Sequence, residues 1–231
     1  MNLLLLETAT SVCSVALAQD VQVSHEIHSD EPNAHSSRLN LFMRDLLRQA
    51  GMRLADVGAV CVSQGPGSYT GLRIGASSAK GICYALGVPL VTVPTLQGMA
   101  QGYYLAHPDY NGLVCPMIDA RRMECYAAIY DRDMTLRKPV GADVVVEGIY
   151  SEWLDEGPVT FVGEGAPKTR DMLGHHPNAR FDGGFRISAA FLLPEALRRL
   201  REGHTEDVAY FEPFYLKDFV AKKSVVHGLR D

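Results

Sequence analysis

The stretch GPGSYTGLRIG, residues 65–75, constrains the fold more than any other part of the chain. Three glycines (Gly65, Gly67 and Gly71), one proline and three hydroxyl side chains lie within seven positions there. The apolar run before it, residues 57–62, predicts a buried strand, and the run after it predicts a helix that ends at Gly87. Such a junction lets backbone approach either an anion at the helix N-terminus or another packed backbone.

Two common phosphate-binding loops can be tested against these residues. A P-loop requires Lys and then Ser or Thr after its last glycine, but Leu72 and Arg73 follow Gly71. A dinucleotide fingerprint requires an acidic residue about 20 positions later, and residues 85–93 contain none. Two interpretations stay open: a tight turn that allows close packing, or an anion or nucleotide site formed by Gly65, Gly67, Ser68, Thr70, Gly71 and Arg73.

The first 30 residues predict a three-stranded antiparallel meander whose first strand is central and ends at Glu7. At Gly112 the pattern restarts, and Asp119 follows an apolar strand as Glu7 does. This similarity predicts an internal repeat, with one lobe at residues 1–100 and a second at 101–231. Coincidence between two ordinary hairpins is the alternative.

An amphipathic helix is predicted over residues 35–50, where five apolar side chains recur at helical spacing. They are Leu39, Phe42, Met43, Leu46 and Leu47. The helix after Gly71 offers many small residues instead. Because Gly lowers helix stability by about 1 kcal/mol relative to Ala, we expect a packing reason for them: close contact with the 35–50 helix or with a partner helix.

Composition excludes several classes of protein. The net charge of −5 and pI of about 5.9 do not fit a domain that binds nucleic acid unaided. The five cysteines include no C-x-x-C pair, which favours free, buried thiols in a reducing cytosol. No apolar run approaches the length of a membrane span, so a cytoplasmic protein without a membrane partner is expected.

The glycine stretch also resembles the signature of the TsaB (YeaZ) family, approximately G-P-G-S-[FY]-T-G-[LV]-R-[IV]-G, at every position. Weaker similarities are the H-S-x-x-L helix start, a D-A-R hairpin and a closing E-P-x-Y-L motif. The chain departs from the family at Glu7, where Asp is usual, and at Lys217, where Arg is usual. TsaB proteins are accessory proteins in making threonylcarbamoyladenosine on transfer RNA.

This resemblance implies an α/β protein with a duplicated actin-like (ASKHA, RNase H-like) two-lobe fold, in which mixed sheets are flanked by helices. In that superfold the opening hairpin contacts phosphate, with a carboxylate organising a metal ion. Glu7, Thr8 and Thr10 therefore join the possible anion- or nucleotide-contacting residues. A buried, capped carboxylate at Glu7 is the alternative.

The family further implies a subunit without catalytic residues of its own, which forms a heterodimer with TsaD and is joined by the ATPase TsaE. TsaD places threonylcarbamoyl on the adenosine next to the anticodon of ANN-reading tRNAs. ATP and a metal would belong to these partners, with no cofactor on this chain, and tRNA would be reached only through the complex. A homodimer is implied for the isolated chain. The expected partner interface, with Met43 at its outer edge, is His35, Leu39, Phe42, Met43, Leu46, Gly75 and Ser78.

Two enzymatic alternatives remain, an ATP-binding phosphotransferase of the actin-like superfold and a glycoprotease-like metallopeptidase. TsaD binds its metal through two histidines four residues apart, but here Leu39 lies four residues after His35. We therefore expect His35 to be a hydrogen-bonding residue at a helix start, and no metal site. No H-E-x-x-H motif occurs. Residues 175–181 are expected to form a loop, and residues 220–231 a tail.

Overall fold

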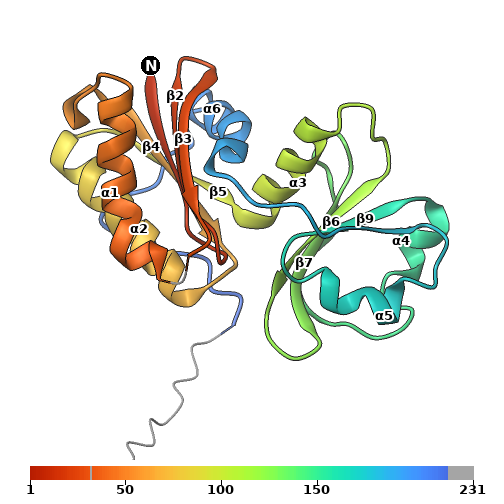
Figure 1. Ribbon diagram of the computed structural model, residues 1–231. Helices are drawn as coiled ribbons and strands as arrows, with labels where there is room; N and C mark the ends of the chain where they lie inside the picture. The colour runs from red at the N-terminus through yellow and green to blue at the C-terminus, as the bar shows by residue number, and fades with distance from the viewer. Residues whose placement is uncertain (32, 218–231) are drawn as a thin grey trace, which may run out of the picture.

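The computed structural model describes residues 1–31 and 33–217, so the expected tail at 220–231 lies outside the described residues. Two five-stranded mixed sheets form two lobes that lie side by side (Figure 1). The strand order is β3-β2-β1-β4-β5 in the first sheet and β8-β7-β6-β9-β10 in the second. In both sheets the first strand along the chain is therefore the central one.

The first sheet contains β1 (Asn2–Glu7), β2 (Cys13–Gln19), β3 (Gln22–Ser29), β4 (Ala59–Gly65) and β5 (Leu90–Pro94). β1 pairs antiparallel with β2 and parallel with β4. The expected meander with a central first strand is confirmed. Since helices cover both faces of this sheet, β1 is apolar without alternation: Leu4 and Leu6 face one cluster, and Leu3 and Leu5 face another.

The helices of the first lobe come from distant parts of the sequence. On one face lie α1 (Ala34–Gln49) and α2 (Tyr69–Leu86), with the short 3-10 helix η1 (Leu54–Asp56) after α1. On the other face lie the 3-10 helix η3 (Ala189–Leu192) and α6 (Leu193–Arg201) (Figure 1). The chain changes from 3-10 to α-helix between Leu192 and Leu193, just before Pro194.

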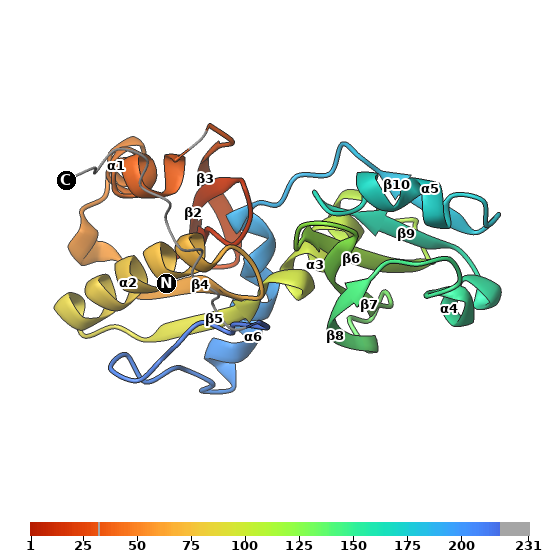
Figure 2. The same cartoon turned by 90° about the horizontal axis from the view of Figure 1, so that it is seen from below.

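The second sheet contains β6 (Leu113–Asp119), β7 (Glu124–Tyr130), β8 (Leu136–Val144), β9 (Val159–Val162) and β10 (Ala179–Asp182). α3 (Thr95–Ala106) packs on one face of it and lies where the two lobes meet (Figure 2). The other face is covered by α4 (Ser151–Glu156), η2 (Pro167–Thr169) and α5 (Arg170–Leu173).

The two sheets share one topology, a meander on one side of the central strand and two parallel strands on the other. The duplicated α/β fold is therefore confirmed. The lobe boundary between 100 and 101 stays a prediction. Within the second predicted range, η3 and α6 pack against the first sheet, around Leu3 and Val91.

Two local expectations are wrong. Residues 179–181, expected to lie in a loop, belong to β10, whose backbone pairs in parallel with β9. β10 is a polar edge strand, so it carries no apolar run to reveal it. β4 begins at Ala59 and continues to Gly65, past the expected end at residue 62, because its backbone pairs with β5 up to Pro94.

All five cysteines are free and buried, as expected. None of the helices in the described part of the chain is both long and apolar enough to cross a membrane.

Candidate functional site

The glycine stretch joins β4 to α2 through a loop held on several sides. The backbone N–H of Gly65, which has φ of +110°, donates to Thr95 Oγ1 at 3.1 Å. Ser68 caps α2, since its Oγ accepts from the N–H of Gly71 at 3.3 Å. Gly87, at φ of +66°, ends α2 as expected.

The glycines of this loop allow α2 to pack directly on the turn between β1 and β2. A Cβ added to Gly67 would lie 2.3 Å from the backbone O of Ala9, and one on Gly71 would lie 2.1 Å from the backbone O of Thr8. One on Gly75 would lie 2.2 Å from Thr8 Oγ1. The Ser68 N–H also donates to Ala9 O at 2.7 Å. The expectation that the small residues of this helix face α1 or a partner helix is wrong for Gly71 and Gly75, which face the chain's own hairpin. It holds for Ala76 and Ala79, which share a core cluster with the apolar side chains of α1.

Glu7 is a buried carboxylate beneath that turn. Its Oε1 accepts from the Ala9 N–H at 2.6 Å and from Ser63 Oγ at 3.0 Å. Burial raises the pKa of Glu7 to about 7, against the opposing effect of these hydrogen bonds. Within residues 1–31 and 33–217, Glu7 Oε2 and Thr8 Oγ1 have no hydrogen-bond partner although both are buried. The geometry is that of the capped carboxylate.

A cleft of about 740 Å³ lies between the lobes. Of the possible anion-contacting residues, Thr10, Gly67, Ser68 and Thr70 line this cleft, together with second-lobe residues such as Asp119, Arg121 and Tyr126. The Ser11 N–H donates to Glu164 Oε2 across it at 3.3 Å. The structure thus brings four of the nine candidate residues to one cleft.

The other candidates lie elsewhere. Glu7, Thr8, Gly65 and Gly71 are buried beside the cleft. Arg73 is exposed on α2, with its guanidinium 5.5 Å from the ring centroid of Tyr69.

The E-P-x-Y-L-K segment, residues 212–217, runs across the cleft from the first lobe to the second. The Phe214 N–H donates to Gln64 O at 2.7 Å, and the Tyr215 ring lies 4.9 Å from that of Tyr69. Lys217 then forms an ion pair with Glu124 of β7. A bridging role for this segment was not expected from the sequence.

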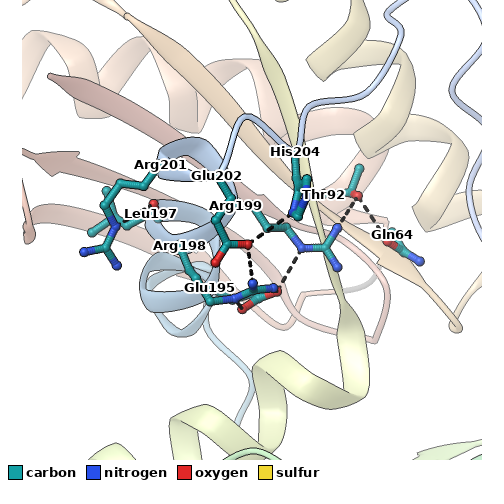
Figure 3. Close-up of polar contacts among 9 residues, drawn as sticks. All are labelled: Gln64, Thr92, Glu195, Leu197, Arg198, Arg199, Arg201, Glu202 and His204. Carbon is teal, nitrogen blue, oxygen red and sulfur yellow. Dashed lines mark hydrogen bonds and ion pairs between the residues drawn. The ribbon is translucent and has the colours of Figure 1, made fainter.

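Figure 3 shows how the end of β4 is supported from α6. Arg199 Nε donates to Glu195 Oε1 at 2.9 Å, and Arg199 Nη1 lies 3.5 Å from Thr92 Oγ1. The Thr92 hydroxyl lies 3.1 Å from Gln64 Oε1, next to the glycine loop. Its nearest acceptor is Glu206 Oε1 at 2.6 Å.

His35 hydrogen-bonds as expected, because its Nε2 lies 3.2 Å from the backbone O of Val12. Burial lowers the pKa of His35, which favours the neutral ring. In the described part of the chain, no three His, Cys, Asp or Glu side chains form a group that could hold a metal ion.

Four of the expected interface residues belong to the core of this chain. Leu39, Met43 and Leu46 are 1%, 6% and 0% exposed, and Gly75 is buried against Thr8. Met43, expected at the outer edge of the interface, is buried in the core where the apolar stripe of α1 packs on α2 and the sheet, and it also lines the groove between these helices. The side chains of His35, Phe42 and Ser78 are only partly buried.

A shallow apolar groove of about 620 Å³ runs between α1, η1 and α2. The sequence pattern did not reveal it, since Leu54, 42% exposed, lies outside the predicted helices. The lining residues, mostly apolar and including two arginines, are Asn40, Met43, Arg44, Leu47, Arg48, Gly51, Met52, Leu54 and Ile82.

The second lobe has a counterpart of the glycine loop, also missed from the sequence. After β9, Gly165 donates its N–H to Met117 O of β6 at 3.0 Å, whereas Ser68 in the first lobe donates to Ala9 O, in the turn after β1. The signal was present as Gly163 and Gly165 directly after an apolar run. Glu164, between these glycines, supplies the contact to Ser11 across the cleft.

Two lobes of one topology around a cleft define the class, a duplicated actin-like protein. The family model "TsaD: tRNA N6-adenosine threonylcarbamoyltransferase" matches residues 23–149. An activator of 2-hydroxyisocaproyl-CoA dehydratase from Clostridium difficile with bound ADPNP shares the fold alone: TM-score 0.51, 11% identity, 88% of this chain and 97% of that one.

Nearer relatives identify the family. The tRNA threonylcarbamoyladenosine biosynthesis protein TsaB of Escherichia coli (strain K12) is 33% identical over 97% of this chain and 98% of its own length. The structure of YeaZ from Pseudomonas aeruginosa superposes with a TM-score of 0.82 at 30% identity, covering 93% of this chain and 99% of that one. The chain belongs to the TsaB (YeaZ) family.

Proposed function

We propose that this chain is a non-catalytic subunit in the biosynthesis of threonylcarbamoyladenosine on tRNA, acting in the cytoplasm as a heterodimer with a TsaD protein. The observation that carries the proposal is the similarity to a TsaB protein over 97% of the chain. TsaD would modify ANN-reading tRNAs and TsaE would join the pair. ATP and the metal belong to those partners, tRNA is bound through the complex, and the chain alone forms a homodimer.

The groove between α1 and α2 supports a protein partner on this face. Its lining combines apolar side chains, such as Leu54 and Ile82, with the charged side chains of Arg44 and Arg48. Stable protein interfaces likewise combine apolar contacts with polar ones around them. Both arginines share Asp45 as their ion-pair partner, and that partner is solvent-accessible. A bound helix can therefore desolvate the groove without leaving either charge buried and unpaired.

Leu54→Glu tests this interface. The side chain is 42% exposed in the isolated chain, so the variant is expected to fold, whereas a carboxylate desolvated by a partner weakens binding strongly. Val144→Glu, at 60% exposure on the second lobe, is the matched control. Complex mass after mixing with the cognate TsaD, and tRNA modification by the mixture, should both fall for Leu54→Glu only. Assembly equal to that of the control would place the interface elsewhere.

Met43→Glu is unsuitable for this test. Met43 is 6% exposed and packs in the first-lobe core, so a charge there would unfold the chain whether or not a partner binds nearby.

The purified chain also tests the non-catalytic assignment. It should neither hydrolyse ATP nor cleave peptides without TsaD, and elemental analysis of untagged protein should find no stoichiometric zinc or iron. ATP turnover by the chain alone that is lost in Thr10→Ala, which alters a hydroxyl lining the cleft, would instead indicate the phosphotransferase.

A further inference from the structure

The turn between β6 and β7 holds two successive arginines in the left-handed region, Arg121 at φ of +70° and Arg122 at +48°. This region is costly for residues with a Cβ, and successive left-handed positions in hairpins are usually occupied by Asn and Gly. Arginine is therefore not explained by the backbone of the turn. Both side chains are exposed.

The carboxylates at the base of this turn already have other partners. Asp119 pairs with Lys168 at 2.5 Å, and Glu124 pairs with Lys217. The charge of Arg121 contributes to lowering the pKa of Asp119, but no ion pair within 4.0 Å joins them. The two carboxylates beside the turn are thus neutralised by lysines. They do not offset the charges of the Arg121 and Arg122 guanidinium groups.

Nearly every other cation in the described residues has a carboxylate, carbonyl or ring contact for its side chain. The groups without a side-chain hydrogen bond, ion pair or ring contact are those of Arg121, Arg122 and Arg180, and only the first two are adjacent. In a chain of net charge −5 this pair is a local concentration of available positive charge.

The turn lies at the rim of the cleft between the lobes. Asp119, Ala120 and Arg121 line that cleft together with His35 and Thr70, from the first turns of α1 and α2. Asp30 and Glu31 line it as well. Both carboxylates are exposed and belong to the first lobe, so an anionic partner is favoured on the second-lobe side of the cleft. This side lies at the N-terminal ends of α1 and α2, whereas the groove proposed for TsaD is lined mainly from their C-terminal parts.

We propose that Arg121 and Arg122 contact the phosphate backbone of RNA, which is the tRNA of the proposed function on which this inference rests. Guanidinium groups bind phosphate oxygens in a bidentate manner, and such contacts position RNA without reading its sequence. Two contacts on a chain with a net negative charge are too few for binding alone. They add affinity and orientation once a partner supplies the main RNA surface.

The test uses the assembled complex of this chain with its TsaD partner and unmodified tRNA. Arg121→Asn with Arg122→Gly removes both charges while placing residues that tolerate left-handed φ, so the thermal midpoint should stay equal or rise. Arg132→Ala with Arg137→Ala removes two exposed charges from the other hairpin of the same sheet and is the control. For the first variant only, tRNA affinity near 0.1 M salt should fall roughly tenfold, and the slope of log K against log salt should decrease in magnitude by about 2.

Complex mass, measured before RNA is added, separates the two proposals. If the wild-type chain does not assemble with TsaD, the proposed function fails. If the Arg121 and Arg122 variant assembles and keeps the affinity and salt slope of the control, the RNA contact is overturned. If it loses assembly itself, the turn binds an acidic protein surface, which also overturns the RNA contact.

Discussion

Each lobe has a turn at the end of its central strand. The acidic residue that precedes this turn is buried in the first lobe and exposed in the second. In the first lobe Glu7 is fully buried and its carboxylate is held by N–H and hydroxyl donors. In the second, the Asp119 side chain is 46% exposed and pairs with Lys168. Burial alone would raise the pKa of Asp119, but Lys168 and the Arg121 N–H outweigh it and hold the pKa below its usual value.

The difference goes with what the loop after the next parallel strand packs on in each lobe. A Cβ on Gly67 would lie 2.3 Å from Ala9 O, in the turn between β1 and β2, whereas one on Gly165 would lie 3.0 Å from Ile118 C, in β6 before its turn. The first loop leads into an 18-residue helix that seals its turn, and the second leads into η2 and the four-residue α5. One duplicated backbone thus provides a packed turn in the first lobe and a charged, solvent-facing turn in the second.

The largest expected effect is that of Gly67→Ala, with a loss of at least about 3 kcal/mol of unfolding free energy. The atom in the way is a backbone oxygen, which cannot rotate aside. Gly165→Ala should cost only about 1 kcal/mol, because its neighbours need to move by a few tenths of an ångström. Urea unfolding of both variants measures the difference. Equal losses would show that the two loops pack equally tightly on the backbone beneath them.

Glu7→Gln tests whether the buried carboxylate of the first lobe is protonated in the folded chain. Because the folded pKa is about 7 and the reference value is 4.5, the native state holds a proton that the unfolded chain releases, so stability falls as pH rises from 4.5 to 7. Above pH 7 the charged form costs up to about 3 kcal/mol. The variant should be close to wild type in stability near pH 5 and more stable at pH 8. A variant less stable than wild type at pH 8 would mean that the native carboxylate is ionised and paired.

Much of this architecture can be predicted from the sequence. The central first strand, the helix ends at Gly51 and Gly87 and the repeat between Glu7 and Asp119 all follow from apolar runs and turn residues. β10 and the bridging segment at 212–217 do not, because the strand is polar and the segment is held by backbone contacts such as that between Phe214 and Gln64. Neither leaves a periodic signal in side-chain type.

The candidate site was less predictable for a different reason. The sequence identifies the glycines as a place of close approach but does not say what approaches. Gly71 and Gly75 meet Thr8, which is more than 60 positions away in the chain. In the same way, the apolar stripe of α1 predicts a buried face, but it does not show that Met43, which is buried in the core, also lines the groove beside η1.

Gly81→Ala tests how far along α2 the contact with the β1–β2 turn extends. Nothing lies within 4 Å of a Cβ at Gly81, and its φ is not in the left-handed region. The variant should stabilise the chain by up to about 1 kcal/mol through helix propensity alone. Gly75→Ala on the same helix should destabilise it, because its Cβ would meet Thr8 Oγ1 at 2.2 Å. Thermal midpoints moving in the same direction would show that Thr8 can rotate away.

The smallest expected effect is that of Asp119→Asn, and its pH dependence should oppose that of Glu7→Gln. The lowered pKa of Asp119 adds stability above its unfolded value of 3.8, and this is lost as the pH falls below it. Since the side chain is 46% exposed, solvent screening limits the effect to about 0.5–1 kcal/mol. The variant should therefore be slightly less stable than wild type at pH 7, and the difference should disappear near pH 3 and shrink in high salt. Urea unfolding at both pH values, with Lys168→Met as the reciprocal variant, measures it. A loss at pH 7 that is insensitive to salt would mean that Asp119 acts through its hydrogen bond to the Arg121 N–H, so that this turn too is stabilised locally and not by its ion pair.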